Sequence, residues 1–410
     1  MAKLYEHGPL TGVRVLEIGH FIAAPFAARL LGDLGADIIK IEPLGGDPVR
    51  QWGEQVNGRS PWWSMHGRNK RSVSINLKHQ KGRELILELA QYCDIMIENF
   101  RPGHLAHLGL GPEGLRSVNP KLVIVQVSGY GQDGPDRDRA AFGVIGEAVG
   151  GLRYLTNKAN PDGEPPVRVG VSIGDSIAGL YAAFGAVAAL LQRERNPDGQ
   201  GLTVDVALSE SVLSMMEGML PEYGALGKIK QPAGSGIATA APTNAYPTAD
   251  STWALIAANS DPLFAKLATL IGQPQLASDP AYADNQSRVK NAASIDAIIG
   301  RWSARHPALE LEQLLNEAGI PNSKIYTAAD CAADAQFRHR GMVQVVKDPD
   351  QGLRLHAGVV PRFMEAPGSI RWAGPTVGEH TAEVLTALLG RTPENVDQLC
   401  EEGVIRLAGR

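Results

Sequence analysis

The first part of the chain alternates between short apolar runs and a helical pattern. Residues 13–18 are rich in branched side chains and end at Gly19, and residues 23–34 carry apolar side chains at helical spacing. Gly35 ends the expected helix, and residues 37–41 form a second branched run. A strand, a helix and a strand in this order predict a right-handed parallel crossover.

The same alternation continues further along the chain. A helix is expected at residues 82–92, and strands are expected at 94–97 and 122–127. Strands that alternate with helices predict an α/β fold, in which a mostly parallel, Rossmann-like sheet is covered by helices on both faces.

Ligand sites in such sheets lie beyond the carboxyl ends of the strands. The loops that begin at His20, Asn99 and Ser128 each follow an expected strand. We therefore expect these three loops to form one site, provided that their strands are neighbours in the sheet.

Proline and glycine cluster at several breaks, and the break at residues 231–236 is the best domain boundary. We predict a large domain of residues 1–229 and 326–410, with its linkers, and a small inserted α+β domain of residues 230–325. A chain of 410 residues exceeds the size that one core usually supports, which also favours two domains.

Composition excludes several kinds of partner. Apolar residues make up 44% of the chain and charged residues 20%, as in a soluble globular enzyme. A net charge of −5 without a long basic block gives no reason to expect nucleic acid or an anionic membrane as partner. The N-terminus lacks an apolar signal segment, and the apolar stretch at 177–191 is short for a bilayer, so we expect a buried helix and a cytoplasmic protein.

Metal and nucleotide motifs are missing from the sequence. Cys93, Cys331 and Cys400 lie too far apart for a CxxC metal pair or a disulfide framework. There is no GxxxxGK[ST] loop and no HExxH motif, and the turn after the first strand is not GxGxxG. We expect no metal site and no permanently bound cofactor, and chemistry with ATP, zinc or NAD loses support.

Residues 167–176 hold two candidate nucleophiles. Residues 170–174 match GxSxG, the nucleophile elbow of α/β-hydrolases, with a strand-like run before Ser172 and an apolar helix after it. The histidines that such a hydrolase could use downstream are His306, His339, His356 and His380. Asp175 is suited to cap the same helix, and the flanking glycines would also expose its ionised carboxylate to a ligand. On these residues alone, both interpretations stay open.

Seven segments in order along the chain carry a further signal. They are LEIGHFIAAP at 16–25, GADIIKIEP at 35–43, NKRS at 69–72, ENFRPG at 98–103, SGYGQDGP at 128–135, GDS at 174–176 and GEHT at 378–381. Together they resemble the motifs of family III CoA-transferases, the formyl-CoA transferase-like or CaiB/BaiF family, over nearly the whole chain. The resemblance implies a CoA-transferase that forms an interlocked homodimer, with Asp175 as covalent nucleophile.

The resemblance also implies a mechanism. Asp175 would attack the thioester of an acyl-CoA to give a mixed anhydride, and the released CoA would convert this anhydride into an aspartyl-CoA thioester. The acceptor carboxylate would complete the exchange by the reverse sequence. A carboxylate is a weak nucleophile, so the site must position it and exclude water. Exchanging one thioester for another is nearly thermoneutral, which agrees with the missing ATP loop.

Several residues take roles by this resemblance. Those that would bind CoA are His20, Phe21, Ile22, Ala23, Arg71, Ile75, Lys78, Asn99, Phe100, His107 and Tyr130. His107 stands where many members have an arginine, which weakens one expected phosphate contact. Ile22 stands where formyl-CoA transferases have a glutamine, which argues against oxalate as acceptor. Gly234, Ser235 and Gly236 occupy the place of a glycine loop that covers the aspartyl intermediate in relatives.

Two further resemblances within the family narrow the type of reaction and the type of acceptor. Related 2-methylacyl-CoA racemases use a His-Asp pair where this chain has Phe142 and Gly143, so a transferase is favoured. Residues 142–148 and 165–168 resemble members that use succinyl-CoA with C4 to C6 dicarboxylic or hydroxy-dicarboxylic acids. The arginines that could bind the second carboxylate of such an acceptor are Arg168, Arg50 and Arg139. We therefore predict CoA transfer from succinyl-CoA to a small dicarboxylate, with a racemase and a Ser172 hydrolase as alternatives.

Overall fold

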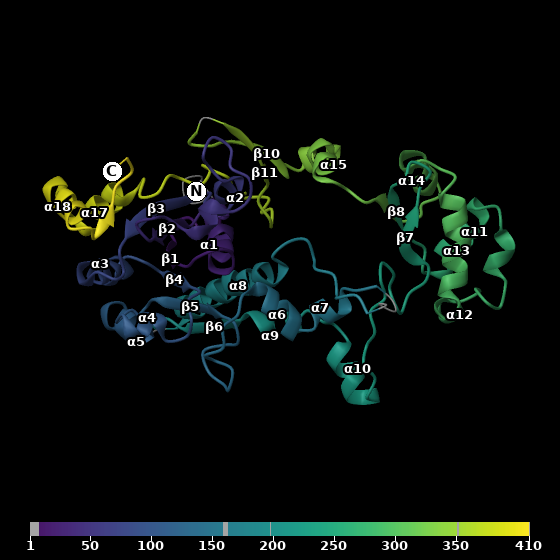
Figure 1. The fold of residues 1–410 in the computed structure, drawn as a ribbon, viewed down its shortest axis with the longest axis horizontal. Coiled ribbons are helices and arrows are strands. Elements are labelled where there is room, and N and C mark those ends of the chain that lie inside the picture. The colour runs from purple at the N-terminus through teal and green to yellow at the C-terminus, as the bar shows by residue number, and fades with distance from the viewer. Residues whose placement is uncertain (1–7, 159–162, 197, 351, 410) are drawn as a thin grey trace. The chain divides into compact units, whose positions relative to one another are not determined.

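The computed structural model describes residues 8–158, 163–196, 198–350 and 352–409. The chain forms two compact units (Figure 1). The first contains the residues up to Leu152, Val169–Leu220 and those from Ala335 onward, and the second contains Arg153–Arg168 and Pro221–Asp334. The sequence placed the limits of the inserted domain at residues 230 and 325, within the longer segment of the second unit.

A seven-stranded sheet forms the centre of the first unit. Its strands are β1 (Arg14–Ile18), β2 (Asp37–Glu42), β3 (Lys70–Ile75), β4 (Ile95–Glu98), β5 (Val123–Ser128), β6 (Thr203–Ala207) and β12 (Ile405–Arg406). They lie in the order β12-β3-β2-β1-β4-β5-β6, and every neighbouring pair is parallel except β3 with β12. The order 3-2-1-4-5-6 is that of doubly wound Rossmann sheets. The predicted α/β class with a mostly parallel sheet is confirmed.

Alternate side chains of these strands pack on opposite faces of the sheet. Val15 and Ile38 belong to the apolar core on one face, and Leu16 and Ile39 belong to the core on the other. The first face is covered by α1 (Ala23–Asp33) and α8 (Ile173–Arg195), and the second by α3 (Gln80–Ala90), α5 (Pro112–Val118), α17 (Thr381–Leu389) and α18 (Pro393–Glu401). Helices therefore cover both faces, as a buried parallel sheet requires (Figure 1).

Helix α8 is, in the described part of the chain, the one helix long and apolar enough to cross a membrane. A core helix of a globular domain passes the same test, so one such helix is weak evidence. Ala178, Ala182 and Ala186 of α8 are fully buried in the core that α1 shares. Their small side chains let the two helices pack closely, and we interpret α8 as a core helix of the first unit.

The strand order creates a crevice at the carboxyl ends of β1 and β4. These strands are neighbours, and Ile18 pairs with Glu98 where both strands end. The chain continues from β1 to β2 on one side, whereas β4 and β5 lie on the other side, so the loops after β1 and β4 diverge. The loops that begin at His20, Asn99 and Ser128 thus follow three adjacent strands, as a common site requires.

The remaining elements of the first unit are short. They are η2 (Pro48–Gln51), α2 (Pro61–His66), α4 (His104–His107), α6 (Gly143–Val149), α9 (Leu208–Leu213), α16 (Ala335–His339) and the antiparallel pair β10 (Val343–Lys347) and β11 (Leu353–Ala357). Two helices cross the limits between the units, namely α7 (Leu152–Leu155) and α10 (Met219–Leu226).

The second unit has its own antiparallel sheet and apolar core. Its strands are β7 (Thr243–Pro247), β8 (Trp253–Ala257) and β9 (Asn322–Lys324), and its helices are α11 (Asp261–Leu270), η3 (Pro274–Ala277), α12 (Asn285–Lys290), α13 (Ala292–Ser303), α14 (Ala308–Glu317) and α15 (Ala328–Ala333). Tyr246, Phe264 and Ile295 lie at the centre of its core. Ser260 starts α11 by accepting a hydrogen bond from the backbone of Leu263, which is the usual role of serine at a helix start.

Candidate active site

A cavity of about 260 Å³ lies in the first unit at the crevice between β1 and β4. Asp175 lines it together with the turn after β1, the loop after β4, the end of β5 and the segment before α6. The other residues predicted for the site that line this cavity are His20, Phe21, Ile22, Ala23, Asn99, Phe100 and Arg139. The structure therefore places the predicted nucleophile beside most of the predicted CoA-binding residues.

Asp175 lies in the first turn of α8. The N-cap residue of this helix is Ser172, so the expectation that Asp175 itself caps it is wrong. Gly143 packs directly against the Asp175 carboxylate, because a Cβ atom on Gly143 would lie 2.0 Å from Oδ2. A Cβ on Gly174 would likewise lie 2.7 Å from the carbonyl oxygen of Gly143. These two glycines allow α6 and the start of α8 to approach closely at Asp175.

Side chains from other loops fix the turn after β1. Asn99 Oδ1 accepts a hydrogen bond from the backbone N–H of His20 at 2.8 Å, and Asn99 Nδ2 donates to the His20 carbonyl at 2.9 Å. Phe21 has a left-handed backbone with φ 60°, which is uncommon for a residue other than glycine. Its N–H donates to Asp47 at 3.2 Å. The rings of His20 and Phe100 meet edge to face with centroids 5.1 Å apart.

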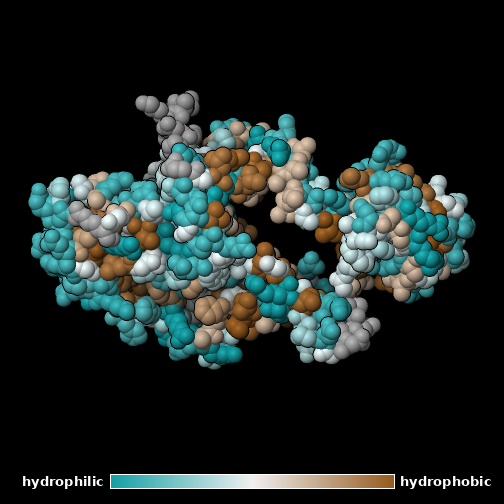
Figure 2. Space-filling model, turned by 45° about the horizontal axis from the view of Figure 1, so that its top comes forward, coloured by the Kyte–Doolittle hydropathy of each residue, from teal (hydrophilic) through white to brown (hydrophobic). Residues whose placement is uncertain are grey.

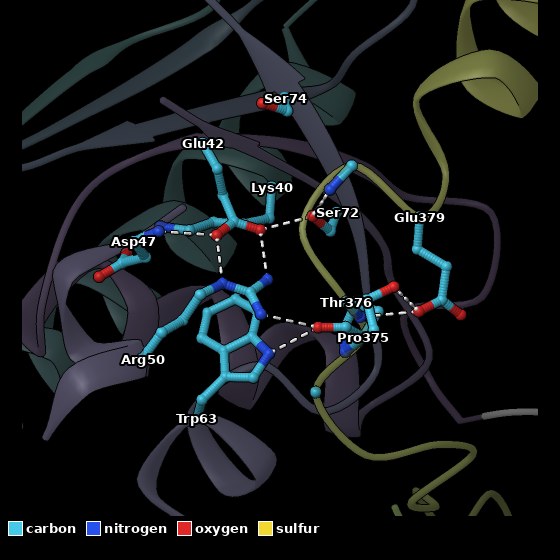
Figure 3. Close-up of polar contacts among 12 residues, drawn as sticks. Lys40, Glu42, Asp47, Arg50, Trp63, Ser72, Ser74, Pro375, Thr376 and Glu379 are labelled. Carbon is cyan, nitrogen blue, oxygen red and sulfur yellow. Dashed lines mark hydrogen bonds and ion pairs between the residues drawn. The ribbon is translucent and has the colours of Figure 1, made fainter. Parts of the chain in front are cut away.

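A cluster of six charged side chains lies next to this turn. Its members are Glu17, Lys40, Glu42, Asp47, Arg50 and Lys70. Lys40 Nζ is 2.9 Å from Glu17 and 2.8 Å from Asp47, and Lys70 Nζ is 2.8 Å from Glu17. Figure 3 shows the Glu42 carboxylate between Arg50, Ser72 and the backbone N–H of Asp47. We call these six residues the charged cluster.

The sequence contained an overlooked signal for this cluster. Glu17, Lys40 and Ser72 are direct partners across β1, β2 and β3, and Glu42 follows Lys40 at the next position on the same face. Polar residues at every second position of a strand usually indicate a solvent-exposed face. Here the face is buried, and the opposite charges on adjacent strands satisfy one another. Opposite charges on strands that had been predicted to be apolar were the clue.

Glu98 is a second functional candidate that the sequence did not single out. It ends β4, is 3% exposed, and accepts hydrogen bonds from the backbone of Phe100 at 2.6 Å and from Gln126 at 3.0 Å. Burial raises the pKa of the Glu98 carboxyl to about 7, because these hydrogen bonds offset the desolvation only in part. The carboxyl thus supports the cavity loop and titrates near neutral pH.

Arg71 does not reach the cavity. It lies near the start of β3, whereas the cavity follows the carboxyl ends of the parallel strands. Its guanidinium is 2.6 Å from Asp37 and 3.2 Å from Glu383. The motif predicted a CoA contact for Arg71, but the structure places this side chain in an ion-pair network at the opposite edge of the sheet.

Four other predicted CoA contacts lie on the cavity side of the sheet without lining the cavity. Ile75 ends β3 and is fully buried in the core, and Lys78 in the next loop is exposed. His107 is exposed at the end of α4. Tyr130 follows β5, and the guanidinium of Arg139 lies 4.9 Å above its ring. Contacts of Lys78 and His107 with CoA phosphates stay predictions.

The three candidate acceptor arginines lie in different places. Arg139 lines the cavity and is 2.8 Å from Asp136. Arg50 belongs to the charged cluster, where its guanidinium contacts Glu42 at 2.7 Å and stacks 3.6 Å from the Trp63 ring. The Arg50 guanidinium therefore contacts Glu42 and Trp63 and does not line the cavity, where we expected it to bind the acceptor carboxylate. Arg168 belongs to the second unit, and its role stays a prediction.

The predicted glycine loop also belongs to the second unit. Gly234 donates its N–H to the Asn157 carbonyl at 3.1 Å, and the Ser235 hydroxyl donates to the Asn244 side chain. Gly236 donates to the Ala233 carbonyl at 3.3 Å, so contacts within the unit shape this loop. Its predicted role in covering an intermediate is not addressed by these contacts.

The serine hydrolase interpretation lacks its structural context. Residues 163–171 are irregular, so the strand that a nucleophile elbow requires before Ser172 is missing from the described chain. His356 Nε2 is 3.1 Å from Ser64, and His380 Nδ1 accepts a hydrogen bond from the backbone of Ser72. Of the two candidate nucleophiles, Asp175 lines the cavity and Ser172 does not. The histidine among the described lining residues is His20, which precedes Ser172 in the sequence.

The presence of one histidine, His20, among the described residues that line the cavity argues against the racemase alternative. Phe142 lines the cavity at the position where racemases have a histidine, and it is followed by Gly143. His20 lies in the turn after β1, and the lining therefore lacks the His-Asp pair after β5 that a two-base proton exchange would use.

The family is now defined by comparison as well as by geometry. The model of CoA-transferase family III matches residues 10–381, and the chain belongs to this family. The relatives that match nearly the whole chain are named CoA-transferases, and the protein is a CoA-transferase.

The chain is similar to named CoA-transferases and to a solved structure of the same family. The chain is 46% identical over 399 residues to succinyl-CoA–D-citramalate CoA-transferase of Chloroflexus aurantiacus, covering 97% of this chain and 98% of that protein. It is 38% identical over 401 residues to the beta subunit of succinyl-CoA–L-malate CoA-transferase from the same organism, with 97% and 98% covered. The crystal structure of a CaiB/BaiF family protein from Brucella suis superposes with a TM-score of 0.83 at 32% identity, covering 93% of this chain and 100% of that one.

Proposed function

We propose that the protein transfers CoA from succinyl-CoA to a small dicarboxylic acid, with Asp175 as the covalent nucleophile. The observation that carries this proposal is the place of the Asp175 carboxylate, in the lining of a cavity at the switch point of a doubly wound sheet. The cavity is also lined by His20, Asn99 and Phe100, which the family resemblance assigns to CoA.

The proposed reaction proceeds through two kinds of acyl intermediate. An oxygen of Asp175 attacks the thioester carbonyl of succinyl-CoA, the C–S bond breaks, and CoA leaves as its thiolate. The thiolate then attacks the Asp175 carbonyl carbon of the resulting anhydride, releasing succinate and leaving an aspartyl-CoA thioester. The acceptor carboxylate attacks this thioester and expels the thiolate, which finally attacks the acceptor carbonyl and restores the Asp175 carboxylate. No proton or electron is gained or lost over the cycle.

Local packing supports this chemistry. The absence of a side chain at Gly143 leaves space beside the Asp175 carboxylate, where an attacking or leaving group must approach. Asn99 holds the backbone of His20 through two hydrogen bonds, so that side of the cavity is preorganised. Arg139 also lines the cavity and is our candidate to bind an anionic group of a substrate.

Similarity to two named enzymes supports the proposed substrates. Both use succinyl-CoA, and their acceptors are D-citramalate and L-malate, which are hydroxylated dicarboxylic acids. We therefore propose a C4 to C6 dicarboxylate as acceptor. Ile22, which is 3% exposed and lines the cavity, offers no hydrogen bond to the second carboxylate of oxalate, so oxalate should be a poor acceptor.

We further propose that the protein works as a homodimer. Leu180, Phe184, Val187 and Leu191 form an apolar stripe along α8, and each is at least 40% exposed in the single chain. Such a stripe usually marks a protein–protein interface. Apolar side chains also reach the surface in other parts of both units (Figure 2). The three cysteines are free thiols, in keeping with a proposed cytoplasmic location.

Turnover of substituted enzymes tests the proposed chemistry. CoA transfer from succinyl-CoA to citramalate, malate and glutarate is measured for the wild type and for the Asp175→Asn and Ser172→Ala variants. We expect Asp175→Asn to abolish transfer, because an amide cannot form the anhydride, and Ser172→Ala to retain it. Full loss in Ser172→Ala with activity kept in Asp175→Asn would instead indicate a serine enzyme.

A further inference from the structure

The turn at Gly19, His20 and Phe21 is held in place by the charged cluster. Phe21 is in the left-handed region, which costs free energy for a residue with a side chain and persists only where surrounding contacts impose it. Its N–H donates to Asp47 Oδ1 at 3.2 Å, and the Gly19 carbonyl accepts a hydrogen bond from Lys40 Nζ. His20 Nδ1 lies 3.8 Å from Asp47 Oδ2. Lys40 and Asp47 therefore contact this turn at three consecutive residues.

Asp47 is placed for this role by its own loop. It is 1% exposed and is the N-cap of η2, where Oδ1 also accepts the N–H of Val49 at 3.0 Å. Its backbone N–H donates to Glu42 at 2.8 Å, and its Oδ2 is 2.8 Å from Lys40 Nζ (Figure 3). One carboxylate thus fixes both its own loop and the turn that lines the cavity.

The charged cluster keeps the carboxylate of Asp47 ionised. Burial alone would raise the pKa of Asp47, but the charge of Lys40 and hydrogen bonds from Lys40, His20 and Val49 together outweigh burial and hold this pKa far below its ordinary value. Burial alone would lower the pKa of Lys40, but Asp47 and Glu17 raise it above its ordinary value. The cluster contains three cations and three anions, so it is balanced as a whole. Removing one charge would leave a buried partner without compensation.

We propose that Asp47 is a positioning residue of the CoA-transfer reaction, which holds the Phe21 N–H, and through it the turn that lines the Asp175 cavity, in its reactive geometry. This inference rests on the proposed function. Asp47 does not line the cavity, so it acts through the turn and not on the substrate. A displaced turn changes the position of the thioester relative to Asp175, which affects the chemical step more than binding.

Two charge-balanced double variants separate the loss of the hydrogen-bond acceptor at position 47 from the loss of its charge. Lys40→Met/Asp47→Asn and Lys40→Met/Asp47→Ala both remove one cation and one anion. They differ in whether position 47 retains an oxygen that can accept the N–H groups of Phe21 and Val49. Thr392→Ala, which removes the N-cap of the distant helix α18, controls for the loss of a cap alone.

We expect the Asn double variant to keep kcat within about tenfold of the wild type and the Ala double variant to lose about 100-fold, with KM for succinyl-CoA changed little in both. Thr392→Ala should keep the wild-type kcat at temperatures where it is folded. Amide hydrogen exchange measures how well the turn is held in the absence of substrate. Amides of residues 19–23 should exchange faster in the Ala double variant than in the Asn double variant.

Two results would overturn the inference while the proposed function stands. One is an active wild type with equal kcat in the two double variants. The other is equal amide exchange of residues 19–23 in these variants. A wild type that transfers no CoA from succinyl-CoA to any dicarboxylate would refute the proposed function, and the assigned role of Asp47 with it.

Discussion

At the scale of single residues, the position of the Asp175 carboxylate depends on two glycines that pack beside it. Gly143 starts α6 and packs against this carboxylate, and Gly174 packs against the Gly143 carbonyl. A side chain at Gly143 would have to displace the Asp175 carboxylate, and one at Gly174 would have to displace the Gly143 carbonyl. The two glycines therefore belong to the active-site geometry, although neither can take part in chemistry.

The Gly143→Ala substitution tests this requirement. The added Cβ would lie 2.0 Å from Oδ2 of Asp175, so the carboxylate must move by an amount that near-attack geometry does not tolerate. We expect kcat to fall about 100-fold while the protein stays folded. The matched control is Gly224→Ala, since a Cβ at Gly224 meets open space. Wild-type kcat in Gly143→Ala would show that the carboxylate does not need this position.

Glu98 leads to a prediction about pH. Burial raises its pKa from an ordinary 4.5 to about 7, so the folded protein binds this proton more tightly than the unfolded chain. The stabilising contribution is complete below pH 4.5 and is lost as the pH rises through about 7. Relative to Glu98→Gln, the free energy of unfolding of the wild type should fall by about 3 kcal/mol between these limits.

Urea unfolding of the first unit across this pH range measures the Glu98 effect. Glu84→Gln, which changes an exposed carboxyl on α3, is the control and should follow the wild type at every pH. A constant difference between wild type and Glu98→Gln from pH 4.5 to 8 would contradict the raised pKa.

The residues that line the cavity could be predicted from the sequence only where a motif position also fixes the direction of a side chain. Asp175, His20 and Asn99 line the cavity as expected because they follow the ends of strands or lie at the start of a helix. The motif of Arg71 does not say which edge of the sheet a residue near the start of β3 faces, and the structure pairs this side chain with Asp37 away from the cavity. Asp47 and Lys40 were overlooked because their contacts with Gly19 and Phe21 span more than twenty residues, and a polar residue in a strand normally indicates exposure.

At the scale of elements, local patterns predicted β1, α1 and β2 to within a residue or two at each end. They did not predict that residues 163–171 are irregular, because a strand needs a neighbour and these branched residues have none in the described chain. They also missed the two faces of α8. One face is buried by alanines, and the other is an apolar stripe that one copy of the chain leaves exposed.

The exposed stripe of α8 leads to a prediction about assembly. Phe184→Asp places a charge in the middle of the stripe and should weaken the proposed homodimer by at least tenfold in dissociation constant, because an interface must desolvate that charge. Leu309→Asp is the control, since Leu309 and Phe184 are both 71% exposed and Leu309 lies outside α8. Light scattering after size exclusion measures both. A monomeric wild type, or an unchanged Phe184→Asp dimer, would contradict the proposed interface.

At the scale of the whole molecule, function depends on the order of strands. The adjacency of β1, β4 and β5 brings the loops after these strands together, and α8 contributes Asp175 to the same cavity. Sequence periodicity gives the strands but not their neighbours, so this order is known from the structure alone. Local breaks predict a domain boundary at residues 231–236, whereas the structure begins the longer segment of its second unit at Pro221.

The central claim is that Asp175 becomes acylated during turnover. The most direct measurement is to incubate the enzyme with succinyl-CoA, trap the acyl group with hydroxylamine, digest the protein, and locate the modified residue by mass spectrometry. Our account predicts a hydroxamate at Asp175 and none in the Asp175→Asn variant. Modification at Ser172 instead, or full turnover by the wild type without any modified residue, would contradict it.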